Sequence, residues 1–136
     1  MKIVIFDTNV LLDLFIFNDF RVLHIKQALI ERQLDALASQ QTLAEFTEVI
    51  SRPLFSLDQS AQEKIVQEWQ SLAHMIDENK IIAAPWQCRD NDDQIFLDLA
   101  YTGKPCVLLS KDNEVLKLAS RAANEGILIT ADYTSL

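Results

Sequence analysis

The sequence predicts an α/β fold, a three-layer α/β/α sandwich around a central, mostly parallel sheet of about five strands. Short apolar runs, typical of strands covered on both faces, alternate with segments whose apolar residues recur at helical spacing. The only two glycines, Gly103 and Gly126, each end a helical pattern just before an apolar run. Strands separated by helices imply parallel pairing with right-handed crossovers.

The first half of the chain is predicted to contain more helix than strand. Ile3–Phe6 is an uninterrupted apolar run that predicts a buried strand, and Leu34–Ala38 is a weaker strand candidate. Because the segment 21–76 is otherwise helical, we expect a helical arm to project there. The apolar stripes of its helices are Val22, Ile25 and Leu29; Leu43, Phe46 and Ile50; and Ile65, Trp69, Leu72 and Ile76.

In the second half of the chain, predicted helices and strands alternate more regularly. The second of those stripes ends at Arg52-Pro53, because the residue before proline resists the α region. After the third stripe, helices and strands are predicted in turn up to the last apolar run. They are a short strand Ile81–Ala84, a helix marked by Phe96, Leu99 and Ala100, a strand Cys106–Leu109, a helix marked by Val115, Leu118, Ala119 and Ala122, and a strand Ile127–Ile129.

Composition indicates one ordinary globular domain over residues 1–136, with 49% hydrophobic and 24% charged residues. No apolar run approaches the roughly 20 residues that span a bilayer, and no signal-peptide cleavage region is present, so we expect a cytoplasmic protein without a membrane partner. Cys88 and Cys106 lack metal-ligand spacing and are expected to be buried free thiols. His24 and His74 are expected at the surface or its boundary rather than as ligands.

The net charge of -8 argues against a nucleic-acid binder with a basic face and is compatible with a basic protein partner. The chain also lacks the glycine-rich phosphate-binding loops and the GxSxG nucleophile turn. Asn9, rather than a second Asp, lies two residues after Asp7, so a haloacid-dehalogenase-like phosphatase lacks its acid.

Four acidic residues are the most informative feature of the chain. Asp7 follows the first apolar run, Asp112 follows the run at Cys106–Leu109, and Glu45 and Asp93 lie where helical patterns begin. The ends of strands and helices are where an α/β sheet gathers its ligand site. Two carboxylates about 4 Å apart repel by about 4 kcal/mol at an effective dielectric near 20, so converging acids take up protons or bind a cation. Oxygen-only ligands suit Mg²⁺ or Mn²⁺.

Each acid also has a purely structural interpretation. Asp7 could cap the following helix, and Asn9 could cap it or orient a carboxylate. Thr42 and Glu45 fit a capping box, while Asp93 and Asp112 suit the first turn of a helix.

Four stretches in order resemble the motifs of the PIN-domain ribonucleases, and are similar above all to toxins of bacterial toxin–antitoxin pairs. The stretches are 3–12, which begins IVIFDTN; 44–53, which contains AEFTEVI and Arg52-Pro53; 88–100, in which Asp90 and Asp93 both match; and 108–116, which contains Ser110, Lys111 and Asp112. The family usually has glycine where this chain has Lys111.

The resemblance implies a Mg²⁺ or Mn²⁺ site formed by Asp7, Glu45, Asp93 and Asp112. Around these four, it implies that Asn9, Asp90 and Ser110 orient carboxylates or water. It further implies a homodimer held by an antitoxin, and hydrolysis of single-stranded RNA. Lys111 could contact the substrate phosphate or point to solvent, and Arg52 is a further candidate for binding substrate.

The sequence therefore predicts a metal-dependent endoribonuclease. Two other functions remain open. One is a catalytically weak PIN-like module that sequesters a basic protein partner, which the charge favours. The other is a phosphoacceptor receiver domain, against which the helix-rich stretch 21–76 argues.

Overall fold

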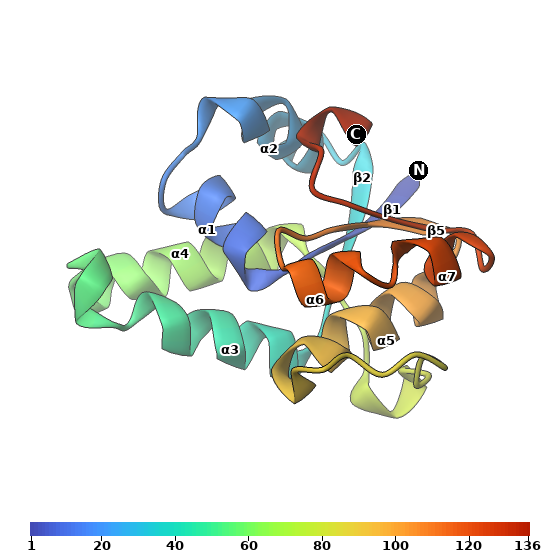
Figure 1. The fold of residues 1–136 in the computed structure, drawn as a ribbon. Helices are drawn as coiled ribbons and strands as arrows, with labels where there is room; N and C mark the ends of the chain where they lie inside the picture. The colour runs from blue at the N-terminus through green and yellow to red at the C-terminus, as the bar shows by residue number, and fades with distance from the viewer.

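Five strands form one parallel sheet in the order β3-β2-β1-β4-β5 in a computed structural model that describes residues 1–136 (Figure 1). The strands are β1 Lys2–Phe6, β2 Leu34–Ala38, β3 His74–Met75, β4 Cys106–Leu109 and β5 Ile127–Thr130. The helices are α1 Thr8–Phe15, α2 Leu23–Ile30, α3 Gln40–Ile50, α4 Gln59–Leu72, α5 Gln94–Gly103, α6 Asn113–Leu116 and α7 Ala119–Ala123. Short 3₁₀ turns are η1 Phe20–Val22, η2 Pro53–Phe55, η3 Glu78–Lys80, η4 Asn91–Asp93 and η5 Tyr133–Ser135. The predicted α/β sandwich is confirmed.

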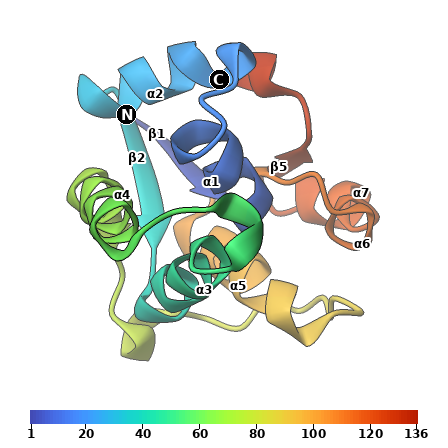
Figure 2. The ribbon, with the colours of Figure 1, turned by 90° about the vertical axis from the view of Figure 1, so that its left-hand side faces the viewer.

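Both faces of the sheet are covered, which explains why its strands are continuous apolar runs. Val4 and Phe6 of β1 pack with α1 to α4 in one core cluster, whereas Ile5 packs with α5 to α7 in a second cluster. Figures 1 and 2 show the two helical layers on opposite sides of the strands. Gly103 ends α5 where the helix approaches the sheet, and a Cβ there would lie 2.5 Å from a Leu37 methyl group.

The central strands β1 and β4 mark the point where the chain connections diverge. From β1 the chain crosses to β2 on one side, and β4 pairs with the other edge of β1. In such parallel sheets, the crevice at the carboxyl ends of the diverging strands is the usual ligand site. In receiver-type sheets the first strand lies between the second and third strands. Here it lies between β2 and β4, which excludes the receiver fold.

The helical arm is confirmed as the pair α3 and α4. The two helices lie side by side, and η2 joins them at an end that extends beyond the sheet (Figures 1 and 2). Near the sheet, the buried Trp69 of α4 packs against Phe6 and Phe15, with ring centroids 6.0 and 5.8 Å apart.

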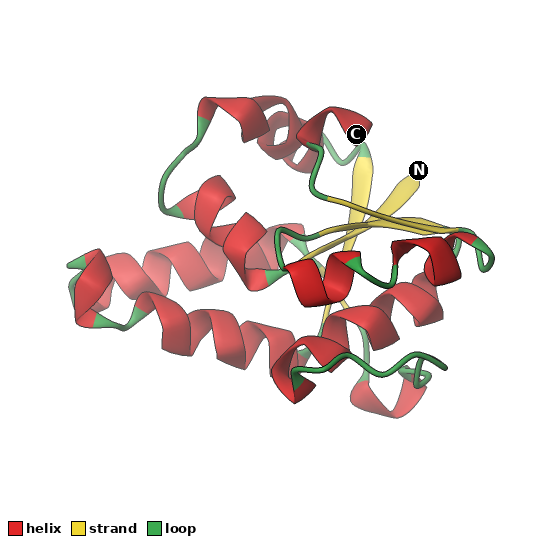
Figure 3. Ribbon diagram, in the orientation of Figure 1, coloured by secondary structure: helices red, strands yellow, loops and turns green.

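The strand predicted at Ile81–Ala84 is wrong. This segment lies in the loop between η3 and η4 (Figure 3), and side chains of α5 satisfy its backbone. The Ile82 N–H donates to Thr102 Oγ1 at 2.8 Å, and the Ala84 N–H donates to Asp98 Oδ1 at 2.9 Å. The edge strand is instead β3, which pairs with Leu37 and Ala38.

Three smaller predictions also need correction. Helix α4 ends at Leu72, so Ile76 lies beyond it and beyond β3. The capping box involves Ser39 and Thr42 rather than Thr42 and Glu45, because α3 begins at Gln40. The helix predicted across Val115 to Ala122 is divided into α6 and α7.

The cysteine and histidine predictions are confirmed. Cys88 and Cys106 are free and buried, and both histidines are exposed. None of the helices is both long enough and apolar enough to span a bilayer.

Candidate active site

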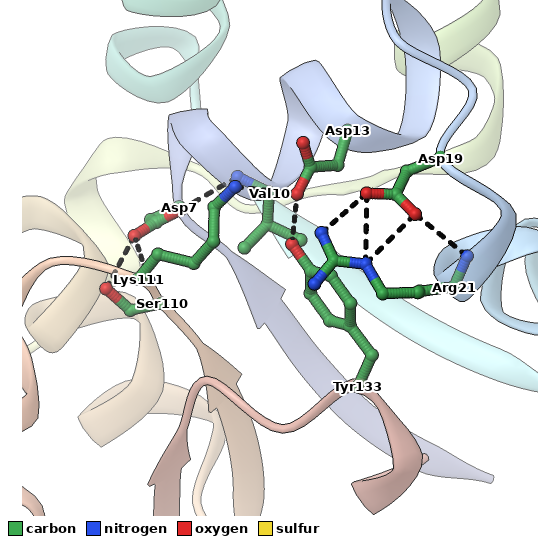
Figure 4. A network of polar contacts seen from close by, with 8 residues as sticks. All are labelled: Asp7, Val10, Asp13, Asp19, Arg21, Ser110, Lys111 and Tyr133. Atoms are coloured by element: carbon green, nitrogen blue, oxygen red, sulfur yellow. Dashed lines mark hydrogen bonds and ion pairs between the residues drawn. The ribbon is translucent and has the colours of Figure 1, made fainter.

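Asp7 lies at the carboxyl end of β1, where its backbone N–H continues the pairing with β4 by donating to the Leu109 carbonyl at 3.1 Å. Its side chain has two roles. Oδ1 accepts the Val10 N–H at 3.0 Å and caps α1, which confirms the capping interpretation. Oδ2 accepts the Ser110 hydroxyl at 2.5 Å and the Lys111 N–H at 3.2 Å (Figure 4). Burial raises the pKa of this carboxyl, and the Ser110 hydrogen bond opposes that rise.

Glu45 lies in the second turn of α3, on the side that faces the start of α1. Its Oε2 accepts a short hydrogen bond from the Thr8 hydroxyl. Partial burial raises the pKa of Glu45, and the nearby charges of Asp92 and Asp7 add to the rise. Because Thr42 occupies the capping-box position, the Glu45 carboxylate does not cap its own helix.

Asp93 and Asp112 lie on either side of α5 and β4 in the sequence and meet as a hydrogen-bonded carboxyl pair. Asp93 ends η4 and directly precedes α5, whereas Asp112 follows β4 and caps α6 by accepting the Glu114 N–H at 2.8 Å. Burial, and then the hydrogen bond and charge of Asp112, raise the pKa of Asp93 to about 7. Asp93 keeps its proton to a higher pH than a free carboxyl because its ionisation beside the charge of Asp112 is opposed by repulsion.

One open groove of about 540 Å³ contains all four predicted acids. We call it the acidic groove. Its carboxylates come from the β1–α1 connection, α3, η4 with its capping residue, and the β4–α6 connection, and they include two more acids near Asp93 in sequence. The complete set is Asp7, Glu45, Asp90, Asp92, Asp93 and Asp112.

The chemistry of this donor set fits a hard divalent cation. All the side chains named are oxygen donors, and three of the four predicted ligands have raised pKa values that reflect burial and crowding of negative charge. In their present orientations, no three His, Cys, Asp or Glu side chains are arranged to hold one metal ion together. The acids instead hydrogen-bond with neighbours, as in the Asp93–Asp112 pair and the contact between Thr8 and Glu45.

The three residues predicted to support the acids lie close to them. The Ser110 hydroxyl donates to Asp7 and accepts the Asp112 N–H at 3.1 Å, so it links two of the acids directly. Asn9 is exposed and lines the acidic groove. Asp90 also lines it and caps η4 through the Asp92 N–H at 2.9 Å.

The two predicted substrate-binding cations are both paired with acids. Arg52 lines the acidic groove and forms two hydrogen bonds with Glu48, at 2.8 and 3.2 Å. The Lys111 ammonium lies 2.7 Å from Asp13 Oδ2, and Lys111 is not among the residues that line the groove. The Lys111 side chain is 38% exposed, so this ion pair leaves part of it in solvent. Its contact with a substrate phosphate stays a prediction.

Sequence reasoning missed Asp13, Tyr133 and Asp92. Asp13 is buried in α1, and its Oδ2 accepts the Tyr133 hydroxyl at 2.5 Å as well as Lys111 (Figure 4). The signal for Asp13 was an acid inside the otherwise apolar run from Val10 to Phe15. For Tyr133 no local signal exists, because its partner lies 120 residues away.

Comparisons with known proteins agree with this fold. The family model described as "PIN domain" matches residues 3–114. Among solved structures, the crystal structure of VapBC2 from Rickettsia felis bound to a DNA fragment from their promoter is similar in fold, with a TM-score of 0.61 and 12% sequence identity. The match covers 95% of this chain and 98% of that chain. No curated protein matches the sequence.

Proposed function

The chain belongs to the PIN domain family, whose model matches residues 3–114 of its 136, and on that basis we propose that it is a metal-dependent endoribonuclease acting on single-stranded RNA. PIN domains are generally nucleases. The observation that carries the proposal is the convergence of Asp7, Glu45, Asp93 and Asp112 in one groove at the carboxyl ends of β1 and β4. Such a site suits hydrolysis of a phosphodiester bond because its acids can hold a cation beside the phosphate.

Asp7, Glu45, Asp93 and Asp112 would hold Mg²⁺ or Mn²⁺, directly or through water. The bound ion would supply an activated water and a positive charge beside the phosphate oxygens. Ser110 holds Oδ2 of Asp7, and Thr8 holds Oε2 of Glu45, so these two carboxylates are oriented before an ion binds. Fixed ligand orientation is a condition for tight metal binding.

The remaining residues of the acidic groove have supporting roles in this proposal. The exposed Asn9 and the carboxylate of Asp90 would hydrogen-bond water or neighbouring ligands. Arg52 is the cation that lines the groove, and its guanidinium would contact a phosphate after release from the exposed pair with Glu48. Exposed ion pairs of this kind contribute only about 0–1 kcal/mol, so the exchange is energetically small.

Replacement of single ligands tests the proposal. Glu45→Gln keeps the size of the side chain and an oxygen that can accept from Thr8, and Asp7→Asn keeps an oxygen that can cap α1. Each change should lower Mn²⁺-dependent cleavage of a labelled single-stranded RNA at least roughly 100-fold, because charge stabilisation of this kind contributes several kcal/mol.

The matched control is Glu63→Gln, an exposed acid on α4 outside the acidic groove, which should cleave at the wild-type rate. Thermal unfolding of each variant, measured in parallel, separates loss of chemistry from loss of fold. Wild-type activity in both folded ligand variants would reject the nuclease assignment.

The acidic groove is also lined by apolar side chains, and these favour a protein partner. Phe17 and Leu54 are 59% and 84% exposed and line the groove, and Phe55 packs beside Phe17 with ring centroids 6.1 Å apart. A partner segment with basic and apolar side chains would match both the acidic and the apolar side chains that line the groove. The solved neighbour is a VapBC2 structure, so we propose that the chain is the toxin of a toxin–antitoxin pair, homodimeric and cytoplasmic, whose antitoxin supplies that segment.

A catalytically weak binding module is the second candidate, and the net charge of -8 favours it because RNA is repelled at long range. In that case the acidic groove would sequester a basic partner without cutting RNA. Titration calorimetry with Mn²⁺, followed by a cleavage assay on the same sample, distinguishes the two. Metal binding without cleavage of any RNA tested would favour the binding module.

A further inference from the structure

We propose that Lys111 is a positioning residue that fixes the loop Ser110–Asp112 onto α1 through both its backbone and its side chain, with Asp13 as its anchor. This inference rests on the proposed nuclease function, because Asp112 of that loop is one of the proposed metal ligands. It assigns a role to Asp13 and Tyr133, and it gives Lys111 a role other than contact with substrate.

Lys111 contacts α1 at two places. Its backbone N–H donates to Asp7 Oδ2 at 3.2 Å, and its ammonium lies 2.7 Å from Asp13 Oδ2 (Figure 4). Asp7 and Asp13 are six residues apart, which corresponds to roughly 9 Å along a helix axis. One lysine therefore fastens the loop both at the start of α1 and farther along the helix.

Asp13 is a firm anchor because it is buried. Its side chain is only 6% exposed, and a buried carboxylate is stable only when it is paired and hydrogen-bonded. Its Oδ2 accepts both the Lys111 ammonium and the Tyr133 hydroxyl, which comes from η5 at 2.5 Å. Since removal of Lys111 would leave the buried Asp13 without its ion-pair partner, this pair differs from the exposed ion pairs of the surface.

Hydrogen bonds connect the loop Ser110–Asp112 to the proposed metal ligands. Ser110 donates to Asp7, and the Asp112 N–H donates to the Ser110 hydroxyl, so all three loop residues belong to one network with Asp7. Asp112 in turn shares a hydrogen bond with Asp93. A loop released from Asp13 would therefore change where the Asp112 carboxylate lies relative to Asp7. Loss of such outer contacts typically lowers metal affinity or activity by 10- to 100-fold.

The chain offers a close control for the charge change. Lys117 lies six residues after Lys111 and pairs with Glu114 at 2.9 Å, but its side chain is 66% exposed and it does not contact Asp7 or Asp13. Lys117→Met therefore removes the same charge from the same region without releasing the loop.

The experiment measures Mn²⁺ affinity by calorimetry, and KM and kcat for cleavage of a single-stranded RNA, in the full chain. Lys111→Met should weaken Mn²⁺ binding roughly 10- to 100-fold, and Lys117→Met should change it less than roughly two-fold. Lys111→Arg, which preserves the charge that reaches Asp13, should restore binding to within a few-fold of wild type. Asp13→Asn should match the Lys111→Met loss, and the double variant should lose no more than either single variant.

The outcomes separate this inference from the nuclease assignment. If wild-type protein neither binds Mn²⁺ nor cuts RNA, the proposed function itself is wrong. If wild-type protein binds Mn²⁺ and cuts RNA but Lys111→Met and Lys117→Met behave alike, only the positioning role is overturned. A higher KM for RNA with unchanged Mn²⁺ affinity in Lys111→Met would also overturn it, because that result indicates direct substrate contact. Should Lys111→Met fail to fold, the Mn²⁺ affinity of Lys111→Gln decides by the same criteria.

Discussion

The raised pKa of Asp93 makes the stability of the protein depend on pH. Burial and the neighbouring Asp112 raise its pKa from 3.8 to about 7, so in the folded protein without metal it keeps a proton that the unfolded chain has released. Between these two values the folded state binds more protons than the unfolded state, so this group lowers stability as pH rises from about 4 to 7. A cation bound as proposed would remove that penalty because it would replace the proton.

The same residue makes Mn²⁺ binding dependent on pH. Because the proposed ion would compete with the proton for the Asp93 carboxylate, we expect Mn²⁺ affinity to fall roughly ten-fold for each pH unit below about 7 and to level off above it. Calorimetry between pH 5.5 and pH 8.5 (about three units) measures this, and Asp93→Asn should lose most of the affinity at every pH. Equal wild-type affinity across the range would show that this carboxyl is not a ligand.

At the scale of elements, the loop Ile81–Ala84 shows that side chains can take the place of a neighbouring strand. Asp98 Oδ1 accepts the Ala84 N–H at 2.9 Å and the Gln94 side-chain amide at 3.1 Å. Gln94 in turn donates to the Trp86 carbonyl and accepts the Cys88 N–H. The first turns of α5 therefore hold the whole loop that leads to η4 and to Asp93.

Removal of this acceptor should destabilise the fold. Asp98→Ala leaves the Ala84 N–H and the Gln94 amide without their partner, which should lower the free energy of unfolding by about 1–3 kcal/mol. Urea denaturation measures the loss. Asp98→Asn keeps an oxygen in the same place and should lose clearly less. If both variants unfold at the wild-type urea concentration, these hydrogen bonds do not stabilise the loop.

At the scale of the whole molecule, the charge distribution limits how RNA can bind. The net charge is -8, and Arg52, which lines the acidic groove, is paired with Glu48. Proteins that bind RNA through many phosphate contacts lose affinity steeply with salt, by a slope of about 0.7 for each phosphate neutralised on a single strand. This chain has few cations to make such contacts in the groove.

RNA affinity should therefore depend only weakly on salt. Fluorescence anisotropy of a labelled single-stranded RNA with Ca²⁺ in place of Mn²⁺, with its integrity checked by electrophoresis, should give a logarithmic slope below about 1.5. Arg52→Met should reduce that slope by about 0.7, whereas Arg121→Met, an exposed cation on α7, should leave it unchanged. A slope of roughly 4 or more would indicate a basic binding face elsewhere on the molecule.

The sequence predicted what depends on local pattern. Covered strands such as β1 and β4 need apolar residues at every position, and the helices need stripes at their own period, so both can be recognised without coordinates. Asp7 and Asp112 were recognisable as candidate site residues because each follows a covered strand. Glu45 and Asp93 were recognisable because each lies where a helical pattern begins, and the resemblance to the family motifs then joined all four acids into one site.

Tertiary structure decided how each polar group is satisfied. Apolar residues at Ile81–Ala84 could form a strand or a loop, and only the presence of Asp98 and Thr102 beside them determined which. The anchoring of Lys111 by Asp13 and Tyr133 joins residues 98 and 120 positions apart from Asp13. A hydrogen bond or ion pair is fixed by distance and direction in space, and no periodicity along the chain encodes either, so the partners of buried polar groups emerge only when the layers pack.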